Sequence, residues 1–290
     1  MIGAELSEAL RFALGARVTG ARRLSGGDIN DAFELTLASG ARVFLKTNDA
    51  ADPNMFPAEA RGLSWLGEAS ALRVPEVLAV SSGRPGEPCF LVLELLEPAP
   101  RTRDFDQRLG RGLAQLHLSG APSFGLDHDN FIGSLPQSNA AAGSWADFLW
   151  TRRFEPQLER AVASGRATSR LRAGFQRLQA RLAQLVGPAE PPARLHGDLW
   201  GGNLHVDEAG MPCLIDPAAY GGHREMDLAM MRLFGGFNEA VFRAYEAEYP
   251  LAPGHAERVA LYQLYPLLVH VNLFGGSYVQ SVEQSLARYA

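Results

Sequence analysis

The sequence predicts an α+β protein of two lobes, with a five-stranded sheet in the N-terminal lobe and mainly helices in the C-terminal lobe. Five strand-like apolar runs lie before residue 97. Beyond that residue apolar positions recur at helical spacing over long segments, and one short strand pair interrupts them. This change of pattern places the boundary between an N-terminal lobe, 1–97, and a C-terminal lobe, 98–290.

The N-terminal lobe is expected to contain two helices beside its strands. The first helix opens the chain and ends at Gly15, and the second opens at Pro57, a residue that suits the first turn of a helix. The short turn 38–40 is suited to a hairpin between the second and third strands. The expected strands are 17–24, 32–37, 42–46, 74–81 and 89–94.

The C-terminal lobe shows helical periodicity and one hairpin. Leu109, Leu113 and Leu116 mark one helix, and a second is expected from residue 171 to residue 185. The hairpin is expected to pair residues 203–206 with residues 211–215 around a turn that contains glycine.

Composition excludes several classes of protein. The 290 residues are 47% hydrophobic and 20% charged, as in soluble globular proteins. The net charge of −5 argues against a nucleic-acid binder, because neutralising phosphates requires a basic face. No signal peptide is recognised, and the most apolar late stretch, 261–274, is too short to cross a membrane. Cys89 and Cys213 lie in apolar runs and are expected to be reduced, buried thiols of a cytoplasmic protein.

Lys46 is the single lysine among 27 basic residues. Its survival by chance at a strand end is one interpretation; the other is that this position needs a compact ammonium group, which arginine does not supply. Lys46 follows a glycine-containing turn, 24–33, and precedes Glu59 in the second expected helix. A glycine turn, a strand lysine and a helix glutamate in this order are typical of the first half of a nucleotide phosphate clamp.

The segment 196–216 contains a second set of polar residues. Asp198 and Asn203 lie five residues apart on a glycine-containing loop, and Asp216 follows at the far end of the expected hairpin. A hairpin returns its second strand beside the start of its first, so Asn203 and Asp216 should face each other. Carboxylate and amide oxygens suit Mg²⁺, and Asp198 outside that pair can accept a proton from a substrate hydroxyl.

With these motifs the chain resembles the protein-kinase-like superfamily in its small-molecule branch, and more narrowly the fructosamine (ketosamine-3) kinase family. The resemblance implies a bilobal protein-kinase-like fold, in which a five-stranded antiparallel sheet forms the nucleotide-binding lobe and a mainly helical lobe carries catalysis and the substrate. The segments that carry it are His196-Gly-Asp-Leu-Trp-Gly-Gly-Asn203, 215–230, 233–237, Asn130-Phe-Ile-Gly133, 261–265 and 273–276.

The resemblance implies a role for each motif. Lys46 would hold the α- and β-phosphates and pair with Glu59, Asp198 would be the catalytic base, and Asn203 and Asp216 would bind Mg²⁺. Asp227 would brace the catalytic loop, and His196 would be structural. Some members of the family have a redox-sensitive cysteine where this chain has Asp28, so a thiol switch at that position is excluded. The remaining nucleotide contacts are expected from Gly26 and Gly27 of the turn and from the hinge 93–96, with Glu94 and Leu96.

The substrate side is expected to include Trp200, Tyr220 and His223. Trp200 lies two residues beyond the proposed base, so its ring would flank the reacting hydroxyl and offer a flat face to a sugar. The alternative is a core aromatic residue beneath the loop. Tyr220, His223 and Arg224 lie in the equivalent of an activation segment and could line the same pocket, and the sequence leaves their side-chain directions open.

The function that follows is an ATP- and Mg²⁺-dependent kinase acting on the 3-hydroxyl of ketosamines, which in the family repairs glycation. Two alternatives stay open: a kinase of another small alcohol, such as an aminoglycoside, choline or homoserine, and a nucleotide-binding pseudoenzyme with a scaffold role. The expected partners are ATP and a small glycated amine or glycated protein, with no nucleic acid and no membrane. The chain is expected to be a monomer or a weak dimer.

Overall fold

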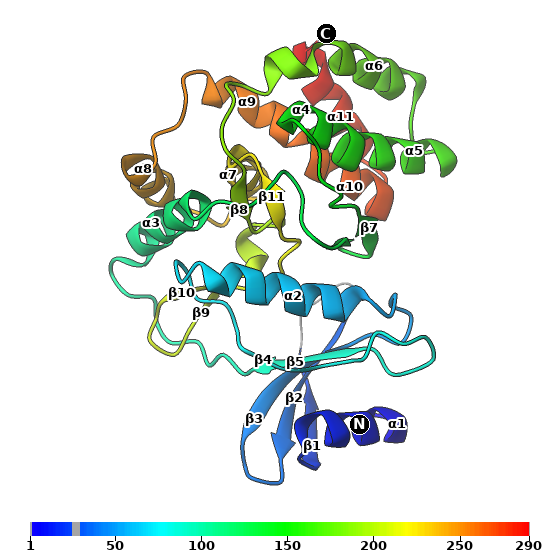
Figure 1. Cartoon of the computed structure of the whole chain (residues 1–290), viewed down its shortest axis with the longest axis vertical. Coiled ribbons are helices and arrows are strands. Elements are labelled where there is room, and N and C mark those ends of the chain that lie inside the picture. The colour runs from blue at the N-terminus through cyan, green and yellow to red at the C-terminus, as the bar shows by residue number, and fades with distance from the viewer. Residues whose placement is uncertain (1, 25–29, 290) are drawn as a thin grey trace.

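The computed structural model describes residues 2–24 and 30–289, which form a sheet-based lobe and a helical lobe (Figure 1). The N-terminal sheet is antiparallel throughout, with its strands in the order β1-β2-β3-β5-β4. All five predicted strands are confirmed. They are β1 (Val18–Arg23), β2 (Asp31–Leu37), β3 (Arg42–Thr47), β4 (Val77–Val80) and β5 (Phe90–Glu94).

Both faces of this sheet are covered by helices, because successive side chains of a strand point to opposite faces. Phe90 and Val92 of β5 pack in one apolar cluster with Leu10 of α1. Leu91 and Leu93 face the other way and pack in a second cluster with α2. The covering helices are α1 (Ala4–Leu14), which ends at Gly15 as expected, and α2 (Met55–Glu68), which begins two residues before the expected Pro57.

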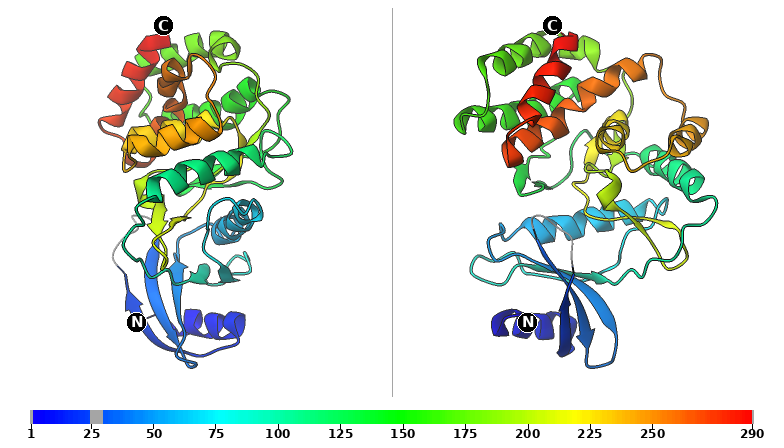
Figure 2. Two further views of the ribbon diagram at one scale, coloured as in Figure 1. Left: turned by 90° about the vertical axis from the view of Figure 1, so that its left-hand side faces the viewer. Right: turned by 180° about the vertical axis from the view of Figure 1, so that it is seen from behind.

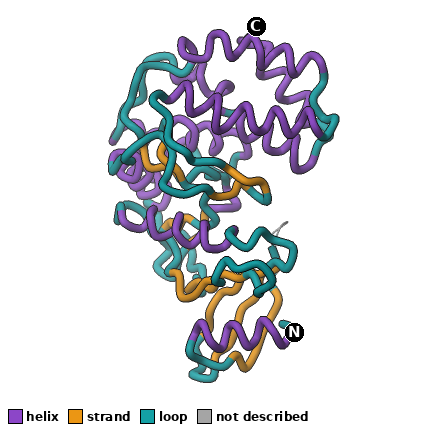
Figure 3. Tube along the Cα trace, turned by 45° about the vertical axis from the view of Figure 1, so that its right-hand side comes forward, coloured by secondary structure: helices purple, strands orange, loops and turns teal. Residues whose placement is uncertain are grey.

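The C-terminal lobe is mainly helical, as predicted, with short strand pairs between its helices (Figures 2 and 3). The helices are α3 (Phe105–Leu118), α4 (Trp145–Phe148), α5 (Glu155–Ala163), α6 (Ser169–Leu185), α7 (Glu225–Phe234), α8 (Glu239–Glu248), α9 (His255–Tyr262), α10 (Leu264–Phe274) and α11 (Tyr278–Leu286). The expected hairpin is formed by β9 (Leu204–Val206) and β10 (Pro212–Leu214). Two further antiparallel pairs are β6 (Asn130–Ile132) with β7 (Leu135–Gln137), and β8 (Ala193–Leu195) with β11 (Tyr220–Gly222).

Helices α3 and α8 lie unusually close together. A Cβ atom at Gly110 of α3 would lie 2.2 Å from the carbonyl oxygen of Val241 in α8, so a larger residue would force the helices apart. The apolar cluster that α3 and α8 form together also contains Leu199 of the predicted catalytic loop and Leu214 of β10. Packing around α3 therefore supports the loop that carries the candidate site.

We propose the boundary between the lobes at residues 97 and 98, because β5 ends at Glu94 and α3 begins at Phe105. Arg73 joins the two sides of this boundary. Its guanidinium group lies 2.8 Å from Glu94, 3.0 Å from Asp207 and 2.7 Å from Glu208 in the turn between β9 and β10. Over the described residues, none of the helices is long and apolar enough to cross a membrane.

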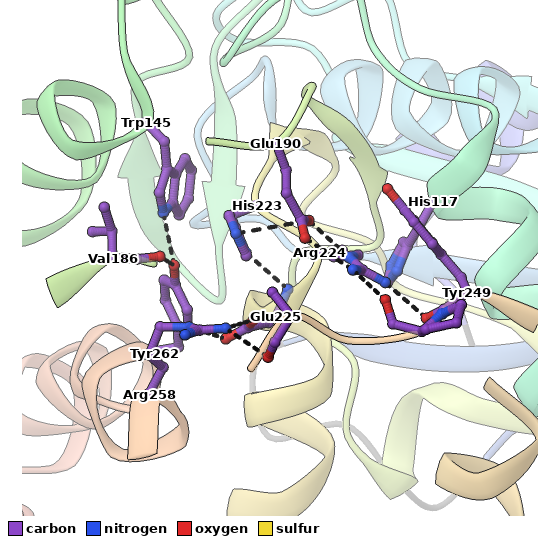
Figure 4. A network of polar contacts seen from close by, with 12 residues as sticks. His117, Trp145, Val186, Glu190, His223, Arg224, Glu225, Tyr249, Arg258 and Tyr262 are labelled. Carbon is purple, nitrogen blue, oxygen red and sulfur yellow. Dashed lines mark hydrogen bonds and ion pairs between the residues drawn. The ribbon is translucent and has the colours of Figure 1, made fainter. Parts of the chain in front are cut away.

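A buried polar network holds the start of α7 against the rest of the C-terminal lobe (Figure 4). The guanidinium group of Arg224 donates to both carboxylate oxygens of Glu190, at 2.8 and 2.9 Å. Arg258 of α9 donates in the same way to Glu225, at 2.9 and 2.6 Å. Each buried cation thus has a bidentate carboxylate partner, the arrangement that best compensates the cost of removing charges from water.

His223 lies among these ion pairs as a neutral side chain. Its ring is 5.3 Å from the ring centre of Tyr262, and its Nε2 is 3.8 Å from Glu190. Within the described part of the chain this Nε2 has no hydrogen-bond partner. Burial lowers the pKa of His223 to about 4. The cations Arg224 and Arg258 lower this pKa further, and the opposing effect of Glu190, which raises it, is smaller than that of burial.

We predict that His223 makes the fold sensitive to mild acid. Below about pH 6.5 the unfolded chain protonates this residue while the folded chain does not, so stability falls as the pH falls toward 4. Between pH 7 and pH 5 the free energy of unfolding should fall by about 2 kcal/mol more in the wild type than in a His223→Gln variant. Denaturant titrations at the two pH values measure this difference. The control is His205→Gln, which removes a partly exposed histidine of β9. Equal pH dependence in wild type and His223→Gln would contradict the prediction.

Candidate active site

A cavity of about 980 Å³ collects the residues that the two sequence motifs contain. Lys46 and Glu59 line it from the N-terminal lobe, and Asp198, Asn203 and Asp216 line it from the C-terminal lobe. Residues separated by up to 170 positions in the sequence are therefore in one site, in the arrangement that the motif order predicts.

Lys46 binds two carboxylates at once. Its Nζ lies 2.8 Å from Glu59 of α2 and 2.6 Å from Asp216, which follows β10. Burial by itself would lower the pKa of Lys46, but the two carboxylates more than offset that effect and raise the pKa above its usual value. The ammonium group is therefore held charged between the lobes, which favours a required ammonium over chance survival of a lysine.

Asp198 follows β8 on the loop that faces the cleft. Burial raises the pKa of its carboxyl group to about 7, and the nearby charges of Asp216 and Asp227 act in the same direction. Asn203 opposes this effect in part, because its Nδ2 donates to the backbone carbonyl of Asp198 at 2.8 Å and to the carboxylate at 3.1 Å. A carboxylate with a pKa near neutral is suited to accepting a proton.

Asp227 holds the loop before Asp198, as the sequence analysis expected. Its carboxylate accepts hydrogen bonds from the backbone N–H groups of His196, at 2.8 Å, and Gly197, at 2.9 Å. Its Oδ2 also lies 3.2 Å from Nε2 of His117 in α3. Gly197 has a φ of +83°, and a Cβ atom there would lie 2.1 Å from the carbonyl oxygen of Ala218, so this position requires glycine.

Asn203 and Asp216 offer oxygen ligands that suit Mg²⁺. Because Nδ2 of Asn203 is used as a donor to Asp198 and, at 3.4 Å, to the carbonyl of Asp216, its Oδ1 is the atom left for a ligand. Across the described ranges, no group of three histidine, cysteine or acidic residues is placed to bind a metal. One carboxylate and one amide fit Mg²⁺, which keeps waters and takes further ligands from substrate phosphates.

The expected hinge lies at the edge of the same cavity. Residues 93–96 line it, and the carboxylate of Glu94 is turned toward Arg73 and the backbone N–H of Glu76. Within the described residues the N–H of Leu96 makes no backbone hydrogen bond. Gly26 and Gly27, expected to cover the phosphates, lie outside the described residues, as does Asp28.

Trp200 lines the cleft instead of the core. Its side chain is 42% exposed, and its ring lies over Gly202, where a Cβ atom would come within 2.3 Å of the indole. The core alternative is therefore excluded for this tryptophan. An exposed indole at the cleft is the placement that a sugar platform needs.

Tyr220 and His223 do not line the cleft, which corrects the sequence prediction. Tyr220 is fully buried, with its ring stacked on Phe148 at 5.7 Å and the guanidinium of Arg153 at 3.9 Å. His223 is buried in the network of Figure 4. The reason is that β11 pairs with β8, and the segment that carries both residues is thereby enclosed in the helical core.

The sequence analysis missed the residues that hold the backbone after Asp216. Asn130 donates to the carbonyl of Ala219 at 2.8 Å, and Gln137 donates to the carbonyl of Ala218 at 3.2 Å and to Asn130 at 2.7 Å. Tyr265 donates in turn to Gln137 at 2.5 Å. Asn130 and Tyr265 belong to segments that carry the family resemblance, but no spacing rule connects them to Asp216.

Comparison with known proteins agrees with this geometry. A family model described as fructosamine kinase matches residues 4–290. A probable ketoamine kinase of Synechocystis is 40% identical, covering 93% of this chain and 90% of its own length. The probable ketoamine kinase YniA of Escherichia coli is 37% identical, covering 91% of each chain.

Solved structures show the same relationship. A crystal structure from Thermobifida fusca that carries the name fructosamine-3-kinase is 36% identical, covers 99% of each chain and superposes with a TM-score of 0.88. The aminoglycoside phosphotransferase APH(4)-Ia is 19% identical, with 99% of each chain covered and a TM-score of 0.65, and shares the fold. Since the family model spans nearly the whole chain and curated relatives are similar over more than nine-tenths of it, the protein belongs to the fructosamine kinase family.

Proposed function

We propose that this protein transfers the γ-phosphate of ATP to the 3-hydroxyl group of a ketosamine, the adduct of a sugar with an amine, with Mg²⁺ as cofactor. The observation that carries the proposal is one cavity that contains the carboxylate of Asp198, the ion pair of Lys46 with Glu59 and two oxygen ligands for a metal. The names of the relatives, ketoamine kinase and fructosamine-3-kinase, support the substrate class and the position of transfer.

The proposed reaction assigns one task to each side chain. Asp198 accepts the proton of the substrate hydroxyl as its oxygen bonds to the γ-phosphorus, and the bond from that phosphorus to the oxygen of the departing ADP breaks. Lys46 holds the phosphates that stay with ADP. Asn203 Oδ1 and the Asp216 carboxylate would hold Mg²⁺, which when bound neutralises charge on the phosphates.

Phosphorylation at this position accounts for a repair role. The new phosphate is next to the carbonyl carbon of the sugar, and phosphate is a better leaving group than hydroxide. Enolisation toward the carbon that carries the amine breaks the bond between the sugar and the phosphate, which leaves as inorganic phosphate. Water then hydrolyses the imine that remains, and the products are the free amine and a dicarbonyl sugar. We propose that the protein reverses glycation in this way.

The test of the proposed function is ATP turnover across a panel of acceptors. We expect turnover with fructose- or ribulose-derived ketosamines and little with an aminoglycoside, choline or homoserine, measured as ADP formed and as phosphorylated product by mass spectrometry. Turnover confined to one of the other alcohols would refute the ketosamine assignment. Nucleotide binding without turnover of any acceptor would support the pseudoenzyme alternative.

We predict that Asp198→Asn lowers turnover by roughly 10²–10⁴-fold, the usual contribution of a general base. Binding of the nucleotide should change little, because Lys46 and the hinge are untouched. Calorimetry with a non-hydrolysable ATP analogue measures binding, and steady-state kinetics measure turnover. Asp104→Asn, which alters an exposed aspartate beside Arg108, is the control. Near wild-type turnover in Asp198→Asn would remove this residue from the role of base.

We predict that Lys46→Arg lowers kcat/KM at least tenfold, a loss of about 1.4 kcal/mol of transition-state stabilisation. A planar guanidinium group is larger than the ammonium that fits between Glu59 and Asp216, both within 2.8 Å. The matched control is the reverse exchange, Arg172→Lys at an exposed position of α6, which should leave kcat/KM and the melting temperature unchanged. Full activity in Lys46→Arg would mean that any cation suffices at this position.

A further inference from the structure

Four aromatic side chains besides Trp200 lie together in the lining of the cleft. Phe234 at the end of α7, His270 and Phe274 of α10 and Tyr278 at the start of α11 all line it. The ring of His270 is at the centre of this group, 4.6 Å from Phe234, 4.9 Å from Tyr278 and 5.4 Å from Phe274 between ring centres. We call these four residues the aromatic wall.

Phe274 of the aromatic wall is exposed, and Phe234, His270 and Tyr278 are partly buried. Phe274 is 55% exposed, and Trp200 in the same cleft is 42% exposed. Only six large hydrophobic side chains are exposed among the described residues, and these two are the ones that line the cavity. Apolar surface left open in a concave site marks a place where a ligand is bound.

The charged side chains that line the cleft do not belong to the aromatic wall. The Lys, Arg, Asp and Glu side chains that line the cavity are Lys46, Glu59, Glu94, Asp198 and Asp216, and all of them belong to the nucleotide and catalytic parts. No lysine or arginine therefore lines the cavity beside the aromatic wall to pair with a carboxylate of the acceptor. This part of the cleft is suited to an apolar group that carries no negative charge.

His270 adds a neutral acceptor to the aromatic wall. Its Nδ1 lies 2.8 Å from the carbonyl oxygen of Pro266, which only accepts, so Nδ1 carries the hydrogen and Nε2 carries the lone pair. Burial lowers the pKa of His270, which keeps the ring neutral at physiological pH. A neutral imidazole and aromatic faces do not repel a protonated amine, and aromatic faces attract one.

We propose that the aromatic wall binds the arm attached to the amine of the ketosamine, and that the protein thereby selects adducts whose amine carries an apolar arm. This inference rests on the proposed function and specifies its substrate class. The arm is either the ring or chain of a free amine or the four-carbon stem of a lysine in a protein. Both sources share the same chemistry, an ammonium group followed by hydrocarbon.

The test compares adducts of one sugar with different amines. The sugar is fructose or ribulose, whichever gives the faster turnover in the panel described above. The amines are methylamine, benzylamine and Nα-acetyl-lysine amide. In the wild type we expect kcat/KM for the benzylamine or the lysine adduct to exceed that for the methylamine adduct at least tenfold, because removing the apolar surface of such an arm from water is favourable. The better of the two identifies the source of the arm.

Phe274→Ala is the decisive variant, because its side chain is half exposed and its loss leaves the core intact. We expect the ratio of kcat/KM between the favoured adduct and the methylamine adduct to fall about tenfold, and Phe274→Tyr to restore it. Phe12→Ala removes an 87% exposed phenylalanine from α1, outside the cleft, and should leave the ratio unchanged. Melting temperatures of all variants exclude a general loss of structure.

The results that would contradict this inference differ from those that would contradict the proposed function. Equal kcat/KM for all three adducts in the wild type, or a ratio that Phe274→Ala leaves unchanged, would overturn the role of the aromatic wall while the proposed function stands. Absence of turnover with every adduct would refute the proposed function, and this inference with it.

Discussion

The contact of Lys46 with both Glu59 and Asp216 is the interaction on which the rest of the site depends. It joins a strand of the N-terminal sheet, the helix that covers that sheet and the segment that follows the hairpin of the other lobe. In a buried cleft each of these charges alone would be costly, whereas together they compensate one another. The charged groups of the cleft are therefore already assembled, and Arg73 provides a second link between the lobes.

The same burial that strengthens this ion pair gives Asp198 its chemistry. A carboxylate at the surface would be a weak base at neutral pH, and partial removal from water raises its pKa to about 7. The loop keeps this position because Asp227 binds two of its N–H groups and because Gly197 allows contact with the backbone at Ala218. The raised pKa of Asp198 and the packing of the loop backbone at Gly197 thus both follow from the way this loop is enclosed.

The cleft divides by chemistry into two parts. The part near Lys46 and Asp216 is charged and suited to phosphate and metal, and the part near Phe274 is aromatic and suited to an acceptor. Trp200 lines the same cleft beside the proposed base, and its backbone N–H donates to the backbone carbonyl of Asp198 at 3.2 Å. On our proposals, the groups that transfer phosphate and the aromatic residues of α7, α10 and α11 that contact the acceptor belong to different parts of the cleft.

The sequence by itself determined the five strands, the helical second lobe and the order of Lys46, Asp198 and Asp216, because these depend on local periodicity and on motifs with fixed spacing. Only the tertiary structure decided the acceptor side. Tyr220 and His223 lie near Asp216 in the sequence but are enclosed in the helical core, since β11 pairs with β8. The aromatic wall is assembled from three helices whose side chains meet only after packing. The direction of a side chain depends on contacts between segments far apart in the chain, and no local pattern in the sequence records those contacts.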